Sequence, residues 1–161
     1  MATITINDND YHSYSTVEQA NNYFVGSFNN LWSNIGEDDK QKLLITSTRL
    51  IDTMEYQGHR VDKEQPLKFP RWMCCEENVS SDDLLIQTCC EVAMGVYQAS
   101  LLSTDVIVPN ADKIKSMSVG DTSISFQDKA DIETDFNAAI AKPIIKKYLG
   151  KWLKGNMRIL L

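Results

Sequence analysis

Glycine and proline are scarce in this chain of 161 residues, which contains seven glycines and four prolines. This scarcity excludes a collagen-like sequence, and an apolar content of 43% argues against a disordered chain. A chain of this length forms one compact domain and needs no disulfide or metal ion to fold.

The common motifs of catalysis are missing as well. The sequence contains no glycine-rich phosphate loop, no HExxH and no GxSxG. Its two histidines, His12 and His59, lie far apart in the sequence, and nucleophilic catalysis needs a base beside the nucleophile. We therefore expect no catalytic residues and a protein that is not an enzyme.

The four cysteines form two adjacent pairs, Cys74-Cys75 and Cys89-Cys90. Zinc sites favour two residues between paired thiolates, so that both reach one ion. Cys89 and Cys90 also fall within an apolar segment, where cysteine packs as a small hydrophobic residue. We expect neither a metal site nor a cofactor.

One segment, Leu84 to Leu102, is apolar enough to raise the question of a membrane span. It contains Gln87, Glu91 and Gln98, and a carboxylate in the middle of a span is costly. The first residues lack the basic start and apolar run of a signal peptide. The prediction is a buried core helix, no membrane contact and a cytoplasmic location.

Charge is distributed unevenly along the chain. The net charge is −6, but residues 1–140 carry all 22 acidic and 10 of the 16 basic side chains, a net of −12. Residues 141–161 hold six basic and no acidic residues. The mean charge argues against a generic nucleic-acid-binding module, which needs a concentrated positive surface, whereas a short basic tail is typical of an interaction arm.

Two helices are predicted in the first third of the chain. Ser15 and Glu18 have capping-box spacing, which predicts a helix that begins after Ser15 and loosens before Gly36. A second helix is expected from Glu37, with Arg49 and Asp52 off its buried stripe and in solvent. The members of that stripe are Leu43, Leu44, Ser47, Leu50, Ile51 and Met54.

Two more helices are predicted further on. The third extends from Asp82 to about Ser100, and its apolar face is so wide that it must be central. The last covers residues 131–149 and is broken or kinked at Pro143, because proline removes one amide donor. Residues 57–81 are expected to form a long irregular connector, pinned to the body by Phe69 and Trp72.

Strand patterns are few. Residues 3–6 alternate and predict a short edge strand. A hairpin is predicted from residues 115–119 and 122–126 around Gly120 and Asp121, with Val119 opposite Thr122 and Met117 opposite Ile124. The predicted fold is mainly α: a compact bundle of four to five helices with one β-hairpin and an extended C-terminal tail.

Several segments occur in an order that resembles one family. They are Tyr14 to Phe24, Thr48 to Asp52, Gly58 to Arg60, and Leu67 to Arg71, where Phe69 stands in place of the usual tryptophan. Over residues 13–149 the chain resembles the head–tail adaptor proteins of tailed bacteriophages, also called connector or head-completion proteins. A related label for such sequences is DnaT-like single-stranded-DNA-binding protein.

The resemblance implies a structural virion protein that forms a ring, commonly of twelve subunits, in the phage neck after assembly in the host cytoplasm. Its implied partners are further copies of itself, the portal protein, and a stopper or tail-completion protein. Double-stranded DNA would pass through the ring without specific binding during ejection. Residues 1–149 would then be the adaptor domain and residues 150–161 a docking tail.

Three groups of candidate site residues follow from this interpretation. The portal-docking candidates are Lys146, Lys147, Lys151, Trp152, Leu153, Lys154, Arg158, Ile159, Leu160 and Leu161. The hairpin candidates, for the ring lumen or a subunit interface, are Ser116, Ser118, Gly120, Asp121, Ser123 and Ser125. The structural loop box consists of Gly58, Arg60, Phe69, Pro70, Arg71 and Trp72.

A second hypothesis is a single-stranded-DNA-binding module. Such a module needs aromatic side chains interleaved with basic ones along a groove. The stretch from Lys147 to Lys154 has this pattern. The tail also has a third interpretation, in which it packs back on the acidic body of its own chain.

Overall fold

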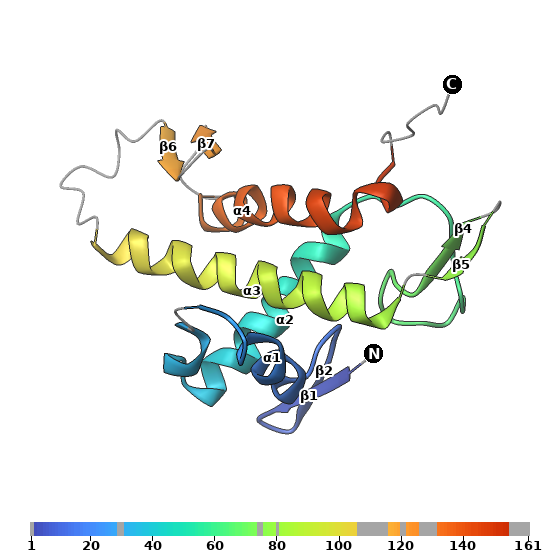
Figure 1. Ribbon diagram of the computed structural model, residues 1–161, viewed down its shortest axis with the longest axis horizontal. Coiled ribbons are helices and arrows are strands. Elements are labelled where there is room, and N and C mark those ends of the chain that lie inside the picture. Colours follow the sequence, from blue (N-terminus) through green and yellow to red (C-terminus); the bar gives the residue numbers. More distant parts are fainter. Residues whose placement is uncertain are drawn as a thin grey trace.

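In the computed structural model, the elements are arranged around one long helix (Figure 1). The structure describes residues 2–28, 31–73, 76–79, 81–105, 116–119, 122–125 and 132–154. Within these ranges the α-helices are α1 (Val17–Phe24), α2 (Glu37–Thr53), α3 (Asp82–Asp105) and α4 (Ile132–Leu149). Two short 3-10 helices are η1 (Leu31–Asn34) and η3 (Gly150–Trp152). The mainly helical prediction is confirmed.

Helix α3 is the centre of the fold, as its wide apolar face predicts. It packs against α1, α2 and α4, and Cys89 and Cys90 are fully buried within it as free thiols. Gly95 allows α4 to approach closely, because an added Cβ would lie 2.9 Å from Cδ1 of Ile144. Figure 1 shows α4 alongside α3, with the first two strands on the opposite side of α3.

The starts of α1 and α2 follow local sequence signals, with one shift. The capping box belongs to Thr16 and Gln19: the Gln19 amide donates to Thr16 Oγ1 (3.1 Å), and the Thr16 amide donates to Gln19 Oε1 (2.9 Å). Ser15 is buried, and its hydroxyl donates to the Thr16 carbonyl instead, so the predicted Ser15–Glu18 box is wrong by one residue. Helix α2 begins at Glu37 as predicted.

A break or a kink was predicted at Pro143, and the break is wrong, because helix α4 continues through this residue. Pro143 is exposed, whereas Ala141, Ile145 and Leu149 are buried. The proline ring therefore lies away from the packed face of the helix. The apolar contacts of that face continue both before and after Pro143.

Strands form three small sheets in the described chain, not one hairpin. The first pairs β1 (Ala2–Ile6) with β2 (Asn9–Ser13), around Asn7 and Asp8 with positive φ of 49° and 62°. The second joins β3 (His59–Arg60), β4 (Arg71–Met73) and β5 (Glu76–Val79). These strands lie where an irregular connector was predicted, which corrects that expectation.

The third sheet is the predicted hairpin, β6 (Ser116–Val119) with β7 (Thr122–Ser125). Its register is confirmed, with Val119 opposite Thr122 and Met117 opposite Ile124. Ser116 pairs with Ser125 and Ser118 with Ser123. The turn residues Gly120 and Asp121 lie outside the described residues.

A buried polar contact joins β2, α2 and the segment before β4. The Tyr14 hydroxyl donates to Asp52 Oδ1 and accepts the Phe69 amide (3.1 Å), while Asp52 Oδ2 accepts the Lys68 amide (3.1 Å). Burial, above all, raises the pKa of the Asp52 carboxyl above its ordinary value. The expectation that Asp52 is solvated is therefore wrong, whereas Arg49 is exposed as predicted.

Candidate nucleic-acid interface

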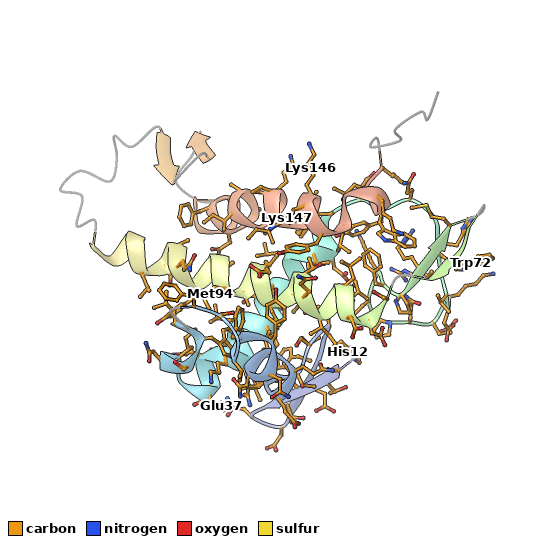
Figure 2. All side chains as sticks on the ribbon, viewed as in Figure 1. His12, Glu37, Trp72, Met94, Lys146 and Lys147 are labelled. Atoms are coloured by element: carbon orange, nitrogen blue, oxygen red, sulfur yellow. The ribbon has the colours of Figure 1, made fainter. Side chains whose placement is uncertain are left out.

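The outer side of α4 and η3 carries five exposed lysines. Ala141, Ile145 and Leu149 form the buried side of α4, so residues at other phases of the helix face solvent. The exposed cations, called the lysine face from here on, are Lys142, Lys146, Lys147, Lys151 and Lys154. Figure 2 shows Lys146 and Lys147 on α4, which lies across α3 from Glu37.

The lysine face contains little negative charge to neutralise it. The chain has no acidic residue from Phe136 onwards. Lys154 Nζ lies 3.4 Å from Glu55 Oε2, in an exposed ion pair. Among residues 136–154 and the other parts of the chain whose side chains the structure describes, no ion pair joins the other four lysines to a carboxylate. These four ammonium groups are therefore available to an anionic ligand.

Backbone hydrogen bonds fix the end of this face to the body of the protein. The Gln57 amide donates to the Trp152 carbonyl (2.7 Å), and the Lys154 amide donates to the Glu55 carbonyl (3.1 Å). Tyr56 and Leu153 form a β-bridge between these two bonds. Lys151 and Lys154 are thereby held at defined positions on the surface.

The predicted docking tail thus begins inside the fold. Trp152 and Leu153 are buried, and the Trp152 ring meets the Phe69 ring edge-on at 6.0 Å. The packed-back arrangement that was one of the three interpretations holds for residues 150–154. Arg158, Ile159, Leu160 and Leu161 lie outside the described residues.

The loop box supports the strands beside η3. Phe69 is fully buried, and a cis peptide bond joins it to Pro70. Arg71 donates to the carbonyls of Gly58 (2.6 Å) and Gln57 (3.0 Å). Burial, chiefly, lowers the pKa of Arg71 below its ordinary value, and the nearby charge of Arg60 contributes.

Trp72 does not have the anchoring role predicted for it. Its side chain is 45% exposed. His59 pairs with Trp72 across β3 and β4, and the two ring centroids lie 6.1 Å apart at an interplanar angle of 58°. The alternation along β4 explains the outcome: Trp72 lies between two partly buried neighbours, Arg71 and Met73, and so takes the outward position of the strand.

Acidic side chains gather elsewhere, on the first hairpin and at the starts of α1 and α2. Asp8, Asp10, Glu18, Glu37, Asp38 and Asp39 are all exposed there. Lysines are few in that region: Lys42 pairs with Asp39 at 3.2 Å, and Lys40 is buried with its Nζ 3.8 Å from Glu37. These acids lie on elements other than α4 and η3, where the lysine face lies.

Two other kinds of site were sought in the described residues. No group of three or more histidine, cysteine, aspartate or glutamate side chains is placed to hold a metal ion. No helix in the same residues is both long enough and apolar enough to cross a membrane.

A family model described as "Putative DnaT-like ssDNA binding protein" matches residues 3–160. The chain belongs to this family. No curated protein and no solved structure matches it.

This match corrects the resemblance to head–tail adaptors, which is wrong; only the related DnaT-like label agrees with the family. The descriptions as a virion, neck, connector and portal-binding protein are corrected with it. The expected ring and its portal and stopper partners rested on that resemblance alone and lose their support. The motifs that carried it, such as the helix starts and the Gly58–Arg60 loop, are features by which helical domains fold, and they specify no place in a virion.

The stretch that the sequence hypothesis selected for DNA binding, Lys147 to Lys154, contains both exposed and buried side chains. In the stretch from Lys147 to Lys154 the lysines are exposed, but Trp152 is buried. The exposed tryptophan is Trp72, more than seventy residues earlier. The sequence has no signal for its exposure, because alternation beside the polar Arg71 would place Trp72 on the inner side of the strand. The short β3–β4 pairing that aligns His59 with Trp72 has no local signal either.

Proposed function

We propose that this protein binds single-stranded DNA through the lysine face, and that its role is binding and not catalysis. The observation that supports this most directly is the group of exposed lysines on and just after α4 and η3; among the side chains that the structure describes, the ion pair of this group is Lys154 with Glu55. Membership of a DnaT-like family described as ssDNA-binding agrees with it.

The geometry of the face suits a flexible phosphate backbone. Lys142 and Lys146 are four residues apart in α4, which places them on one side of the helix, about 6 Å apart along its axis. Lys147 and Lys151 continue the face toward η3. Each ammonium group is a point charge on a flexible stem, and can therefore follow phosphates whose spacing is not fixed by a duplex.

The magnitude of the salt effect follows from the number of lysines. Each phosphate neutralised on a single strand contributes about −0.7 to the slope of log affinity against log salt concentration. Four lysines therefore predict a slope near −3, and a loss of roughly 50-fold in affinity between 50 and 200 mM salt.

The test is a matched pair of double variants. Lys146→Gln/Lys147→Gln removes two charges from the lysine face, and Lys42→Gln/Lys63→Gln removes two exposed lysines elsewhere. Binding to a fluorescent oligothymidylate is measured by anisotropy across a salt series. We expect the first variant to bind more weakly, with a slope shallower by about 1.4, and the second to retain the wild-type slope.

Two results would refute the proposal. One is no salt-sensitive binding of the wild-type protein to the oligonucleotide. The other is an equal loss in both variants, which would reflect net charge and not the lysine face. A duplex of the same sequence serves as competitor, and we expect it to displace the single strand poorly.

A further inference from the structure

Trp72 differs from the other two tryptophans of the chain. Trp32 and Trp152 are each 1% exposed and belong to the core, whereas Trp72 is 45% exposed. Its neighbour across the β3–β4 pair is His59, which is also exposed. The exposed indole ring of Trp72 offers a flat aromatic face to solvent, and the His59 ring lies beside it at an angle of 58°.

The backbone beneath these rings is tightly constrained. Gly58 has a positive φ of 76°, and a Cβ added there would lie 2.5 Å from the Trp72 carbonyl oxygen. Arg71 holds the Gly58 carbonyl from the other side (2.6 Å). The two ring-bearing residues are thus displayed from a fixed turn and strand, and not from a loose loop.

The aromatic pair is also connected directly to the lysine face. Gln57, two residues before His59, donates its backbone amide to the Trp152 carbonyl and its side-chain amide to the Lys151 carbonyl. In Figure 2, Trp72 lies on the side of the molecule where α4 ends and η3 begins. Gln57 thus links the segment that carries His59 to the segment that carries Lys151.

We propose that Trp72, with His59 beside it, forms a platform on which a nucleobase of the bound strand stacks. The proposal rests on the proposed function. It adds to the phosphate-binding lysines a side chain that distinguishes unpaired bases from paired ones. A base in a duplex is covered on both faces by its neighbours, whereas an unpaired base can turn outward and stack on an aromatic ring. Stacking of this kind tolerates any base, because every base has a π face.

The first experiment separates stacking from phosphate binding by the choice of probe. Wild-type protein is titrated with an oligothymidylate and with an abasic oligomer of equal length and charge. We expect a preference for the thymidylate of roughly 5- to 150-fold, which corresponds to one stacked base. Trp72→Ala should abolish that preference and leave the affinity for the abasic oligomer unchanged.

Two further variants act as controls. Trp72→Phe keeps an aromatic face and should retain part of the preference. Phe28→Ala removes an aromatic residue that is fully exposed after α1, away from β3 and β4, and should change neither affinity. Far-ultraviolet circular dichroism of each variant establishes that it is folded.

Tryptophan fluorescence provides a second readout at the residue itself. Because Trp32 and Trp152 are buried, we expect oligothymidylate to quench the emission of Trp72, and Trp72→Phe to remove the quenched component. The abasic oligomer should quench little.

The outcomes distinguish this proposal from the one on which it rests. Binding that depends on Lys146 and Lys147, with equal affinity for both oligomers and no quenching, would overturn the platform and leave the lysine face standing. An affinity for the abasic oligomer that falls with Trp72→Ala would also overturn it, since the residue would then support the fold. Absence of any salt-sensitive binding would overturn both.

Discussion

Removal of the Tyr14 hydroxyl tests the buried contact that joins β2, α2 and the segment leading into β4. Tyr14 is 4% exposed; its hydroxyl donates to the Asp52 carboxylate and accepts the amide of the fully buried Phe69. Burial, followed by the charge of Asp52, raises the pKa of Tyr14 above its ordinary value, so the hydroxyl keeps its proton throughout the neutral range. Tyr14→Phe therefore deletes one donor and one acceptor and little else.

The expected loss has two parts. A hydrogen bond to a charged group contributes about 1.5–3 kcal/mol, and a buried amide left without an acceptor costs about 1–3 kcal/mol. Removal of the Tyr14 hydroxyl leaves the buried Phe69 amide without this acceptor. Because the two effects share one site and do not simply add, we expect the free energy of unfolding to fall by about 2–4 kcal/mol.

Urea denaturation followed by circular dichroism measures this change, and calorimetry should show a Tm lower by roughly 5–15 °C. Tyr56→Phe is the matched control. Tyr56 is equally buried, but its hydroxyl donates only to the uncharged Ile51 carbonyl (2.9 Å), so its deletion should cost about 1 kcal/mol. A Tyr14→Phe loss no larger than that of the control would refute the reasoning.

Two further predictions concern neighbouring residues. Gly58→Ala should destabilise the protein by more than about 1 kcal/mol in urea denaturation, because the residue has a positive φ and its new Cβ would meet the Trp72 carbonyl; an unchanged midpoint would contradict this. Asp52→Asn should alter the pH dependence of stability. Since burial raises the pKa of Asp52 in the fold, its stabilising contribution is complete below the unfolded pKa of about 4 and is lost as pH rises through the folded value. The variant should therefore gain stability relative to wild type over that rise, and parallel curves would disprove the assignment.

Local signals in the sequence predicted the elements that depend on local interactions. The acids at Glu37 mark the start of α2, the apolar face of the segment after Asp82 marks a central helix, and the Gly120-Asp121 spacing gives the register of β6 and β7. Each of these features is determined by residues within a few positions of one another, which is the range over which periodicity and turn chemistry act.

Two strand pairings were missed: the local pairing of β2 with β1, a strand that had been predicted, and the pairing of β3 with the more distant β4. The β1–β2 hairpin had a signal in Asn7 and Asp8, two residues that tolerate positive φ, but β2 itself does not alternate cleanly between apolar and polar residues. Strand β3 is two residues long, and it exists because Gly58 turns the chain so that His59 faces Trp72. Pairings of this kind are stabilised by contacts that a one-dimensional pattern does not contain.

The candidate interface follows the same division. The lysines could be found from composition, because they are the cations in a segment without acids. The outward position of Trp72 and the inward position of Trp152 could not, since both lie beside basic residues in the sequence. Their difference arises from Phe69 and Tyr56, which pack into the core beside Trp152 and leave Trp72 on the outer side of its strand.

Net charge is a poor guide to whether this protein can approach an anionic polymer. At physiological salt, exposed charges are screened beyond about 8 Å. Helix α4, with Lys146 and Lys147, lies across α3 from Glu37, so a phosphate at α4 responds to the lysines and little to the acids near Glu37 (Figure 2). The net negative charge of residues 1–140 then orients the protein relative to a DNA strand, because only the side with the lysine face attracts the strand. At 0.01 M salt the screening length grows to about 30 Å, and the acids begin to oppose binding. We therefore expect the affinity of this protein for the oligonucleotide to level off as the salt concentration falls to about 0.01 M. The affinity of a uniformly basic protein would continue to rise over the same range.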